Sequence, residues 1–422
     1  MATQSIDHAA VEPARELSTL GVVSSAHLVS HLHLMVLPAL MYLLTDRMQV
    51  SYTELGLALT AFSLVSGLTQ APMGVLVDRI GGRVVLMSGL VLGGAAFASL
   101  SVFDSYTWLI TAAVLAGLAN CVYHPADYSI LSTEISERRM GRAFSVHTFA
   151  GFAGSAIAPP LLLAIAGWAG VGASFIFAGL CAWAVAALVL LMPAARPILA
   201  GVRSAATPGG GKGARSGTKD AATGAANGNL LEVLNPTVLG LTLFFTLLGL
   251  SGSAMSSFAI AALIDGHGVA PSVATAALTG YLTASAAGVL AGGPVADRTT
   301  RHGLVAAAGF GIAAVLALII AVATLPAPVL VMAMALTGFL YGIVQPARDM
   351  LVRKAAPPGA TGRVFGIVST GFNIGGIVGP VLFGLLMDRG LPRWIFGLAV
   401  IFMTITAVLG ILEERRARPQ PA

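Results

Sequence analysis

The sequence predicts an all-α membrane protein with twelve transmembrane helices, arranged as two six-helix halves. Three observations predict this fold class. The 422 residues are 56% hydrophobic and only 10% charged, whereas a soluble protein carries roughly 25% charged residues. The apolar residues form continuous blocks of about twenty, which is the length of a helix that crosses a hydrocarbon core of ~30 Å. The motifs of the first half then recur in the second half.

The apolar blocks place the membrane-spanning helices in order along the chain. Each block is uninterrupted, which favours helices over the short alternating strands of a membrane barrel. The first block follows a polar start that lacks the basic residues of a signal peptide, so we expect it to be an uncleaved span. The expected spans are 19–44, 52–76, 84–103, 107–131, 143–166, 168–192, 236–263, 271–295, 303–324, 326–350, 364–386 and 392–412.

Polar segments divide the chain into domains. We expect an N-terminal half at 19–192 and a C-terminal half at 236–412, with tails at 1–18 and 413–422. The segment 193–235 is rich in Gly, Ala, Ser and Thr and has no apolar periodicity. Such a composition predicts a flexible linker between the two halves.

The distribution of Lys and Arg predicts the orientation in the membrane. With both termini inside, only Arg47, Arg389 and Arg393 of the 23 basic residues fall outside, and Arg348 lies near the inner end of a span. This bias predicts cytoplasmic termini, tails and linker. Because the basic residues lie between apolar blocks, the net charge of +5 is typical of membrane-protein loops and does not indicate nucleic acid as a partner. We expect a multi-pass monomer in the lipid bilayer of a bacterial inner membrane.

An internal repeat is the most informative feature of the sequence. The second span ends in GVLVDRIGGR at 74–83, and the eighth ends in GPVADR at 293–298. The fourth span carries YHPAD at 123–127, and the tenth carries VQPAR at 344–348. Two halves that repeat in the same order are typical of transporters that rock about a central site.

These motifs resemble those of the major facilitator superfamily. The run at 74–83 matches its loop signature G-x-L-x-D-R-x-G-x-R, and the resemblance covers the chain except for the termini and the linker. Within the superfamily, the Tyr-His-Pro at 123–125 is most similar to the fosmidomycin-resistance-type exporters. The resemblance implies the major facilitator fold and an alternating-access carrier driven by an ion gradient, usually of protons.

The resemblance also implies a gating role for charged residues in the two repeated loops. They would lock the inner ends of the helices in the outward-facing state, because opposite charges at a low-dielectric edge can form a two-state latch. The alternative is that these charges only anchor a cytoplasmic loop. The residues are Asp78, Arg79, Arg83, Asp297 and Arg298.

Polar side chains inside the spans are candidates for substrate and proton binding, because such groups are costly in a bilayer. In the fourth span they recur at three- and four-residue steps on one helix face, and the tenth span has an equivalent stripe. We expect the two stripes to face a shared cavity; the alternative is hydrogen bonding between the helices of each half. The candidates are Asn120, His124, Asp127, Tyr341, Gln345 and Arg348 in the stripes, His27 and His31 in the first span, and Asn373, with His147, as lesser ones.

His124 is the leading candidate for a proton-binding or substrate-binding group, because imidazole changes its charge near physiological pH. Asp127 and Arg348 occupy equivalent positions near the inner ends of their helices. We expect them to pair across the halves when the inner gate is closed, unless Asp127 pairs with Arg79 or Arg83 in its own half. A free Arg348 would suit an anionic substrate, since guanidinium matches carboxylate or phosphonate geometry.

The first span holds three histidines. His27 and His31 lie one turn apart on one face, which is metal-ligand spacing, whereas His33 points elsewhere. The sequence places no third ligand beside this pair. The alternative is that His31 lines the cavity as a proton or substrate group.

The sequence therefore predicts a secondary active transporter that moves a small solute across the inner membrane by alternating access. We expect proton-coupled export of an organic anion or drug-like compound, without a cofactor. One alternative is a carrier of a transition metal or metal chelate that uses the membrane histidines. A more remote alternative is an intramembrane enzyme, against which the sequence offers no nucleophile elbow.

Overall fold

The computed structural model describes residues 13–192, 235–357 and 361–416. The predicted linker at 193–235 lies outside these ranges except for its last residue, as do the outer parts of both predicted tails. Within the described ranges the chain is α-helical apart from short connections.

Twelve helices in the described ranges are long and apolar enough to cross a membrane, which confirms the predicted number of spans. The first begins earlier than expected, at Pro13. The elements of the N-terminal half are α1 (Pro13–Met48), α2 (Tyr52–Ile80), α3 (Gly82–Ser99), α4 (Tyr106–Asn120), α5 (Tyr123–Glu134), α6 (Glu137–Ala169) and α7 (Val171–Leu191). Those of the C-terminal half are α9 (Pro236–Ser257), α10 (Ala259–His267), α11 (Pro271–Asp297), α12 (His302–Val322), α13 (Ala327–Ala355), α14 (Thr361–Asp388) and α15 (Arg393–Arg416).

The fourth span is broken into two helices, α4 and α5, instead of the single helix expected at 107–131. The break lies at Cys121 and Val122. Pro125 explains it, because proline has no N–H for the carbonyl of Cys121 and its ring clashes with that carbonyl. The break places His124 and Asp127 in the first two turns of α5, where they lie beside α1 and α6.

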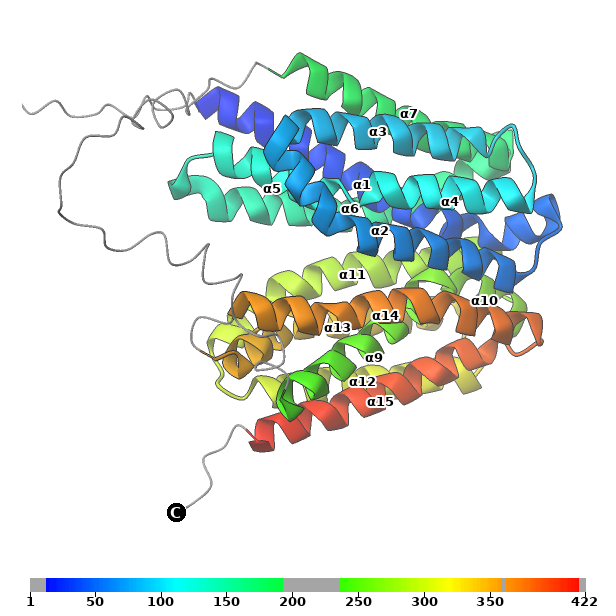
Figure 1. Cartoon of the computed structure of the whole chain (residues 1–422). Coiled ribbons are helices and arrows are strands. Elements are labelled where there is room, and N and C mark those ends of the chain that lie inside the picture. Colours follow the sequence, from blue (N-terminus) through cyan, green and yellow to red (C-terminus); the bar gives the residue numbers. More distant parts are fainter. Residues whose placement is uncertain (1–12, 193–234, 358–360, 417–422) are drawn as a thin grey trace, which may run out of the picture.

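The same helix pairs form in both halves. In the N-terminal half α1 packs against α6, α2 against α4, and α3 against α7. The equivalent pairs of the C-terminal half are α9 with α14, α11 with α13, and α12 with α15. Figure 1 shows the two halves as separate layers, the blue-to-green half above the green-to-red half. The sequence repeat is therefore also a repeat of packing.

The halves meet where α2 packs against α14 and where α6 packs against α11. We call the end of the bundle that carries Tyr52 and Asp388 the closed end. There Asp388, the last residue of α14, accepts hydrogen bonds from the backbone N–H groups of Tyr52 and Thr53, at 2.8 and 2.9 Å. Farther along α2, a Cβ added to Gly56 would lie only 2.3 Å from the carbonyl oxygen of Pro380. Glycine is therefore what lets the two helices cross so closely.

The other end of the bundle carries the repeated loops with Asp78 and Asp297, and we call it the motif end. The described contacts between α2 and α14 reach Gly67, whose added Cβ would lie 3.6 Å from Asn373. Beyond that point α2 exposes 70–72 and α14 exposes 369–370. The two halves therefore separate toward the motif end (Figure 1).

Candidate functional site

Four histidines and one aspartate gather in the N-terminal half. Helix α1 supplies His27 and His31, α5 supplies His124 and Asp127, and α6 supplies His147. We call these five residues the His–Asp cluster. Because these residues lie on three different helices, the packing of those helices brings them together.

Glycines on α6 allow the cluster to form. A Cβ added to Gly154 would lie 2.1 Å from the carbonyl oxygen of Leu28, so α1 and α6 touch backbone to backbone there. A Cβ added to Gly151 would lie 2.7 Å from His27 Nε2 and 2.9 Å from His31 Nε2. The absence of these side chains leaves room for the imidazoles between the two helices.

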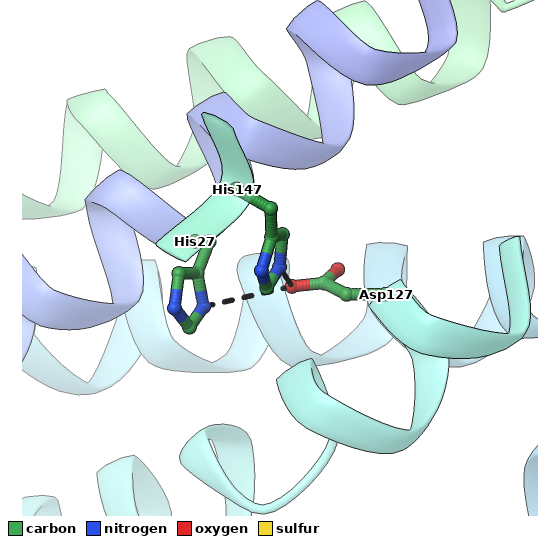
Figure 2. Close-up of side chains that lie close together, drawn as sticks. All are labelled: His27, Asp127 and His147. Carbon is green, nitrogen blue, oxygen red and sulfur yellow. Dashed lines mark hydrogen bonds and ion pairs between the residues drawn. The ribbon is translucent and has the colours of Figure 1, made fainter. Parts of the chain in front are cut away.

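Asp127 is the one carboxylate of the His–Asp cluster and is fully buried. Its Oδ2 lies 3.0 Å from His147 Nε2 and 3.8 Å from His27 Nδ1, as Figure 2 shows. The rings of His27 and His147 are stacked, with centroids 3.9 Å apart and planes 20° apart. The carboxylate therefore has one imidazole as its direct hydrogen-bond partner and a second one at ion-pair distance.

The other two histidines extend the cluster in different directions. The ring of His31 lies edge-on to His27, 4.7 Å away, and its Nδ1 is 3.0 Å from the hydroxyl of Ser155. The ring of His124 lies 5.3 Å from His27 and 5.7 Å from the ring of Tyr128. Because His124 and Tyr128 are exposed, the cluster runs from an exposed surface to a buried carboxylate.

The buried part of the cluster is not fully hydrogen-bonded. Asp127 Oδ1, His27 Nδ1 and His147 Nδ1 are all buried without a hydrogen-bond partner. Buried polar atoms are normally paired, and each exception calls for an explanation such as a functional role. The arrangement therefore has spare capacity for a proton or another cation.

A metal ion is one cation that these residues could hold. One ligand atom each of His27, Asp127 and His147 lies within 4.8 Å of the other two, whereas the sequence suggested the pair His27 and His31. An imidazole binds a metal through a lone pair in its ring plane, at about 2.0–2.1 Å for zinc. Two stacked rings cannot both aim such a lone pair at one ion, so the observed ring geometry does not fit a metal held by both.

In this structure Asp127 forms neither of the two ion pairs that the sequence suggested. Pairing within its own half is wrong here, because Arg79 is exposed and Arg83 binds Glu134 at 2.6 Å. Pairing with Arg348 is predicted for a closed motif end, and it stays a prediction because this structure is open there. Asp127 is instead buried where α5 lies against α1 and α6.

Sequence reasoning missed the acidic partners of the motif end. Glu134 accepts hydrogen bonds from Arg83 and from the hydroxyl of Thr19, and Glu16 pairs with Arg139 at 2.9 Å. Both acids lie at helix ends, and both were left unassigned. Acidic residues close to loops rich in arginine are the signal that could have found them.

The remaining gating residues are solvent-exposed in this structure, so their role as a latch stays a prediction. They are Asp78, Arg79, Asp297 and Arg298.

In the C-terminal half, Arg348 is partly buried between aromatic rings. Its guanidinium lies 4.8 Å from the ring centre of Phe245 and 5.1 Å from that of Phe372. Its Nε and Nη2 donate to Asp349 Oδ1 at 2.9 and 2.8 Å, while Nη1 is buried without a hydrogen-bond partner. The side chain therefore keeps one unused donor, and Gln345 lies one turn before it on α13.

The other candidate residues lie apart from the His–Asp cluster. Asn120 donates to the hydroxyl of Ser66 at 2.9 Å, and Tyr341 donates to the carbonyl of Leu248 at 3.3 Å. Each of these bonds joins two helices of the same half. Asn373 is exposed on α14, at the last described contact with α2.

The sequence profile of the Major Facilitator Superfamily matches residues 23–258 and 239–422. Among solved structures, a bacterial homologue of the human lysosomal transporter Spinster, in an inward-facing and unoccupied conformation, has a TM-score of 0.78. That likeness covers 97% of this chain and 100% of the other at 15% sequence identity, so it shows a shared fold.

Curated proteins with related sequences come from bacteria. The chain is 26% identical to the Fosmidomycin resistance protein of Escherichia coli (strain K12), over 88% of this chain and 86% of that protein. It is also 26% identical to the Multidrug resistance protein MdtH of Aeromonas hydrophila, over 98% of this chain and 99% of that protein. A shorter match, at 27% identity, covers 30% of this chain and 28% of the Probable L-galactonate transporter of Escherichia coli (strain K12).

Proposed function

The chain belongs to the Major Facilitator Superfamily, and from this premise we propose that it exports a small organic anion or drug-like compound, driven by protons, across a bacterial inner membrane. Membership makes it a multi-pass secondary transporter and not an intramembrane enzyme. The observation that carries the coupling part of the proposal is the buried Asp127. Within the described residues, its ionisable partners at hydrogen-bond or ion-pair distance are two imidazoles.

The orientation of the carrier follows from its basic residues. Arg79, Arg83, Arg298 and Arg301 lie at the motif end, and such a bias favours the cytoplasmic side. With the motif end in the cytoplasm, the separation of the halves there corresponds to an inward-open state. A substrate would then bind from the cytoplasm, as an exporter requires.

Arg348 supports an anionic substrate. Its guanidinium is held in place by two aromatic rings and keeps one unused donor, and guanidinium matches carboxylate geometry. The names of the related proteins agree with this class, since two are resistance proteins and one is a probable transporter of an organic anion. A carrier of metal ions is the alternative, and the stacking of His27 on His147 counts against it.

The test is uphill transport in proteoliposomes. A panel of organic anions and drug-like compounds is first screened by thermal shift, because a ligand of the folded state raises its stability. A compound that binds should then move against its own gradient when a pH gradient is imposed, and a protonophore should abolish that movement. Flux that only runs downhill, whatever the pH gradient, would contradict the proposal.

Matched variants test the role of Arg348. Arg348→Gln should weaken the affinity for an anionic compound by about tenfold or more, since a charge-assisted hydrogen bond contributes ~1.5–3 kcal/mol. Arg353→Gln is the control, because Arg353 is an exposed arginine on the same helix. Equal affinities in the two variants would remove Arg348 from the substrate site.

A further inference from the structure

We propose that Asp127 and His147 form the proton-binding site that couples transport, with His124 as its access point and His27 between them. This inference rests on the proposed function, because it names the residues that would carry the proton. It depends on the contacts of Asp127, on the charge of the cluster and on the exposed position of His124.

Asp127 differs from the other buried carboxylates in the described part of the chain. Those lie at helix ends, and each accepts a hydrogen bond from an arginine or a backbone N–H. They are Glu16 with Arg139, Glu134 with Arg83, Glu413 with Arg416, and Glu414 with the N–H of Gly303. Asp127 is instead hydrogen-bonded to His147, a group that gains or loses its charge with one proton.

The charge of the cluster depends on one proton. With Asp127 ionised and the four histidines neutral, the cluster carries a net charge of −1 in the protein interior. A lone buried charge is strongly unfavourable. When one proton enters the hydrogen bond between Asp127 and His147, the net charge becomes zero, whichever of the two atoms holds it. Loss of that proton restores the charge of −1. Binding of the proton therefore lowers the free-energy cost of keeping the cluster buried.

Within the described residues, the arginines of the neighbouring helices near the motif end have other surroundings. On α6, Arg139 binds Glu16, and Arg138 and Arg142 are exposed; on α1, Arg15 lies 3.8 Å from Glu134. Tyr123 and Tyr128 flank Asp127 on α5, and α1 and α6 contribute the histidines already named. The charged residues of α2 and α3 near the motif end are Asp78, Arg79 and Arg83. The first two of these are exposed, and Arg83 binds Glu134.

The positions of the imidazoles offer a route for the proton. His124 is exposed, and its ring lies 5.3 Å from that of His27, whose Nδ1 lies 3.8 Å from Asp127 Oδ2. Each imidazole can take a proton at one nitrogen and release one from the other. A proton from water at His124 can therefore reach Asp127 and His147 through His27, with rotation of the rings between transfers.

The test separates coupling from movement of the carrier. Asp127→Asn keeps the size of the side chain but cannot be ionised. We expect this variant to lose uphill transport driven by a pH gradient while it retains exchange of labelled for unlabelled substrate at equal pH. His147→Gln, which keeps a hydrogen-bond donor without a titratable group, should show the same split. Retained uphill transport in Asp127→Asn would overturn the proposal, and so would loss of exchange together with uphill transport.

The control is His33→Gln. His33 is buried on the same helix as His27, but its Nε2 lies 3.0 Å from the carbonyl of Ala178 and its ring packs on Phe97. This variant should keep both uphill transport and exchange. A loss of coupling in His33→Gln equal to that in Asp127→Asn would show that any buried histidine change has this effect, and would overturn the assignment.

A readout without substrate separates this inference from the proposed function. Infrared difference spectra of the purified protein should show a protonated carboxyl band that titrates with pH, and that band should vanish in Asp127→Asn but persist in His33→Gln. This result would support the site even if no tested compound is transported. Absence of the band from the unaltered protein, or stoichiometric Zn²⁺ binding that disappears in both Asp127→Asn and His147→Gln, would overturn it.

Discussion

Asp388 joins the two halves at the closed end, and its removal should shift the carrier toward the state that is open there. Its carboxylate accepts from the first two N–H groups of α2, at Tyr52 and Thr53, which no carbonyl of that helix can satisfy. The hydroxyl of Tyr52 adds a second link between the halves through Asp265, at 2.7 Å. The N-terminus of α2 is thus capped by the opposite half.

The size of the shift follows from these contacts. A hydrogen bond to a charged group contributes about 1.5–3 kcal/mol, and an anion at a helix N-terminus gains ~0.3–1 kcal/mol. Asp388→Asn keeps one acceptor oxygen and loses the charge, and Asp388 is exposed to water. We therefore expect a loss of about 1–2 kcal/mol, which changes the ratio of the two states roughly 5- to 30-fold.

Spin labels can measure this ratio. Val102 and Leu391 are exposed, at 72% and 41%, and lie in closed-end loops of opposite halves. Spin labels at these two positions, in a background without Cys121 and Cys181, allow the distance between the halves to be measured by double electron–electron resonance. Asp388→Asn should transfer population to longer distances.

Asp104→Asn is the matched control for this experiment. Asp104 binds Arg47 at 2.7 Å, and both residues belong to the N-terminal half at the same end. Its loss should leave the distances between the halves unchanged. An unchanged distribution in Asp388→Asn, or an equal shift in both variants, would refute the reasoning.

Three further outcomes are expected. Gly56→Ala should prevent the closed end from closing and slow transport in a flux assay, because its Cβ would lie 2.3 Å from the Pro380 carbonyl oxygen. Gly21→Ala is the control: its Cβ meets no atom within 4 Å, and transport should be unchanged. Glu134→Gln should lower the thermal stability measured in detergent by an amount equivalent to ~1–3 kcal/mol, because Arg83 loses its buried anion; an unchanged melting temperature would contradict this. Asp78→Asn should slow transport at normal expression by favouring the motif-open state, and normal transport would leave this residue only an anchoring role.

Much of the site could be recognised from sequence patterns. The polar stripe of the fourth span identified His124 and Asp127, and helical spacing placed His27 and His31 on one face with His33 elsewhere, as the structure confirms. These inferences succeed because they depend on the period of one helix. They involve no knowledge of which helices are neighbours.

The partners of Asp127 could not be predicted in this way. His147 was only a lesser candidate, because the connection between α5 and α6 separates it from Asp127 along the chain. The break itself follows from Pro125, yet its effect on the direction of Asp127 depends on how α5 lies against α1 and α6. The same holds for Arg83 and Glu134, which are far apart in the chain and meet only at the motif end.

The sequence by itself determined the twelve spans, the two repeated halves and the set of polar residues inside the membrane, because lipid imposes length and polarity on every helix separately. Only the tertiary structure decided that two histidines lie against one buried aspartate, and that Asp388 caps a helix of the opposite half. Those contacts depend on the close approach of particular helices, which glycines such as Gly154 and Gly56 permit. Close packing is a property of pairs of surfaces, so it emerges only when the helices are assembled.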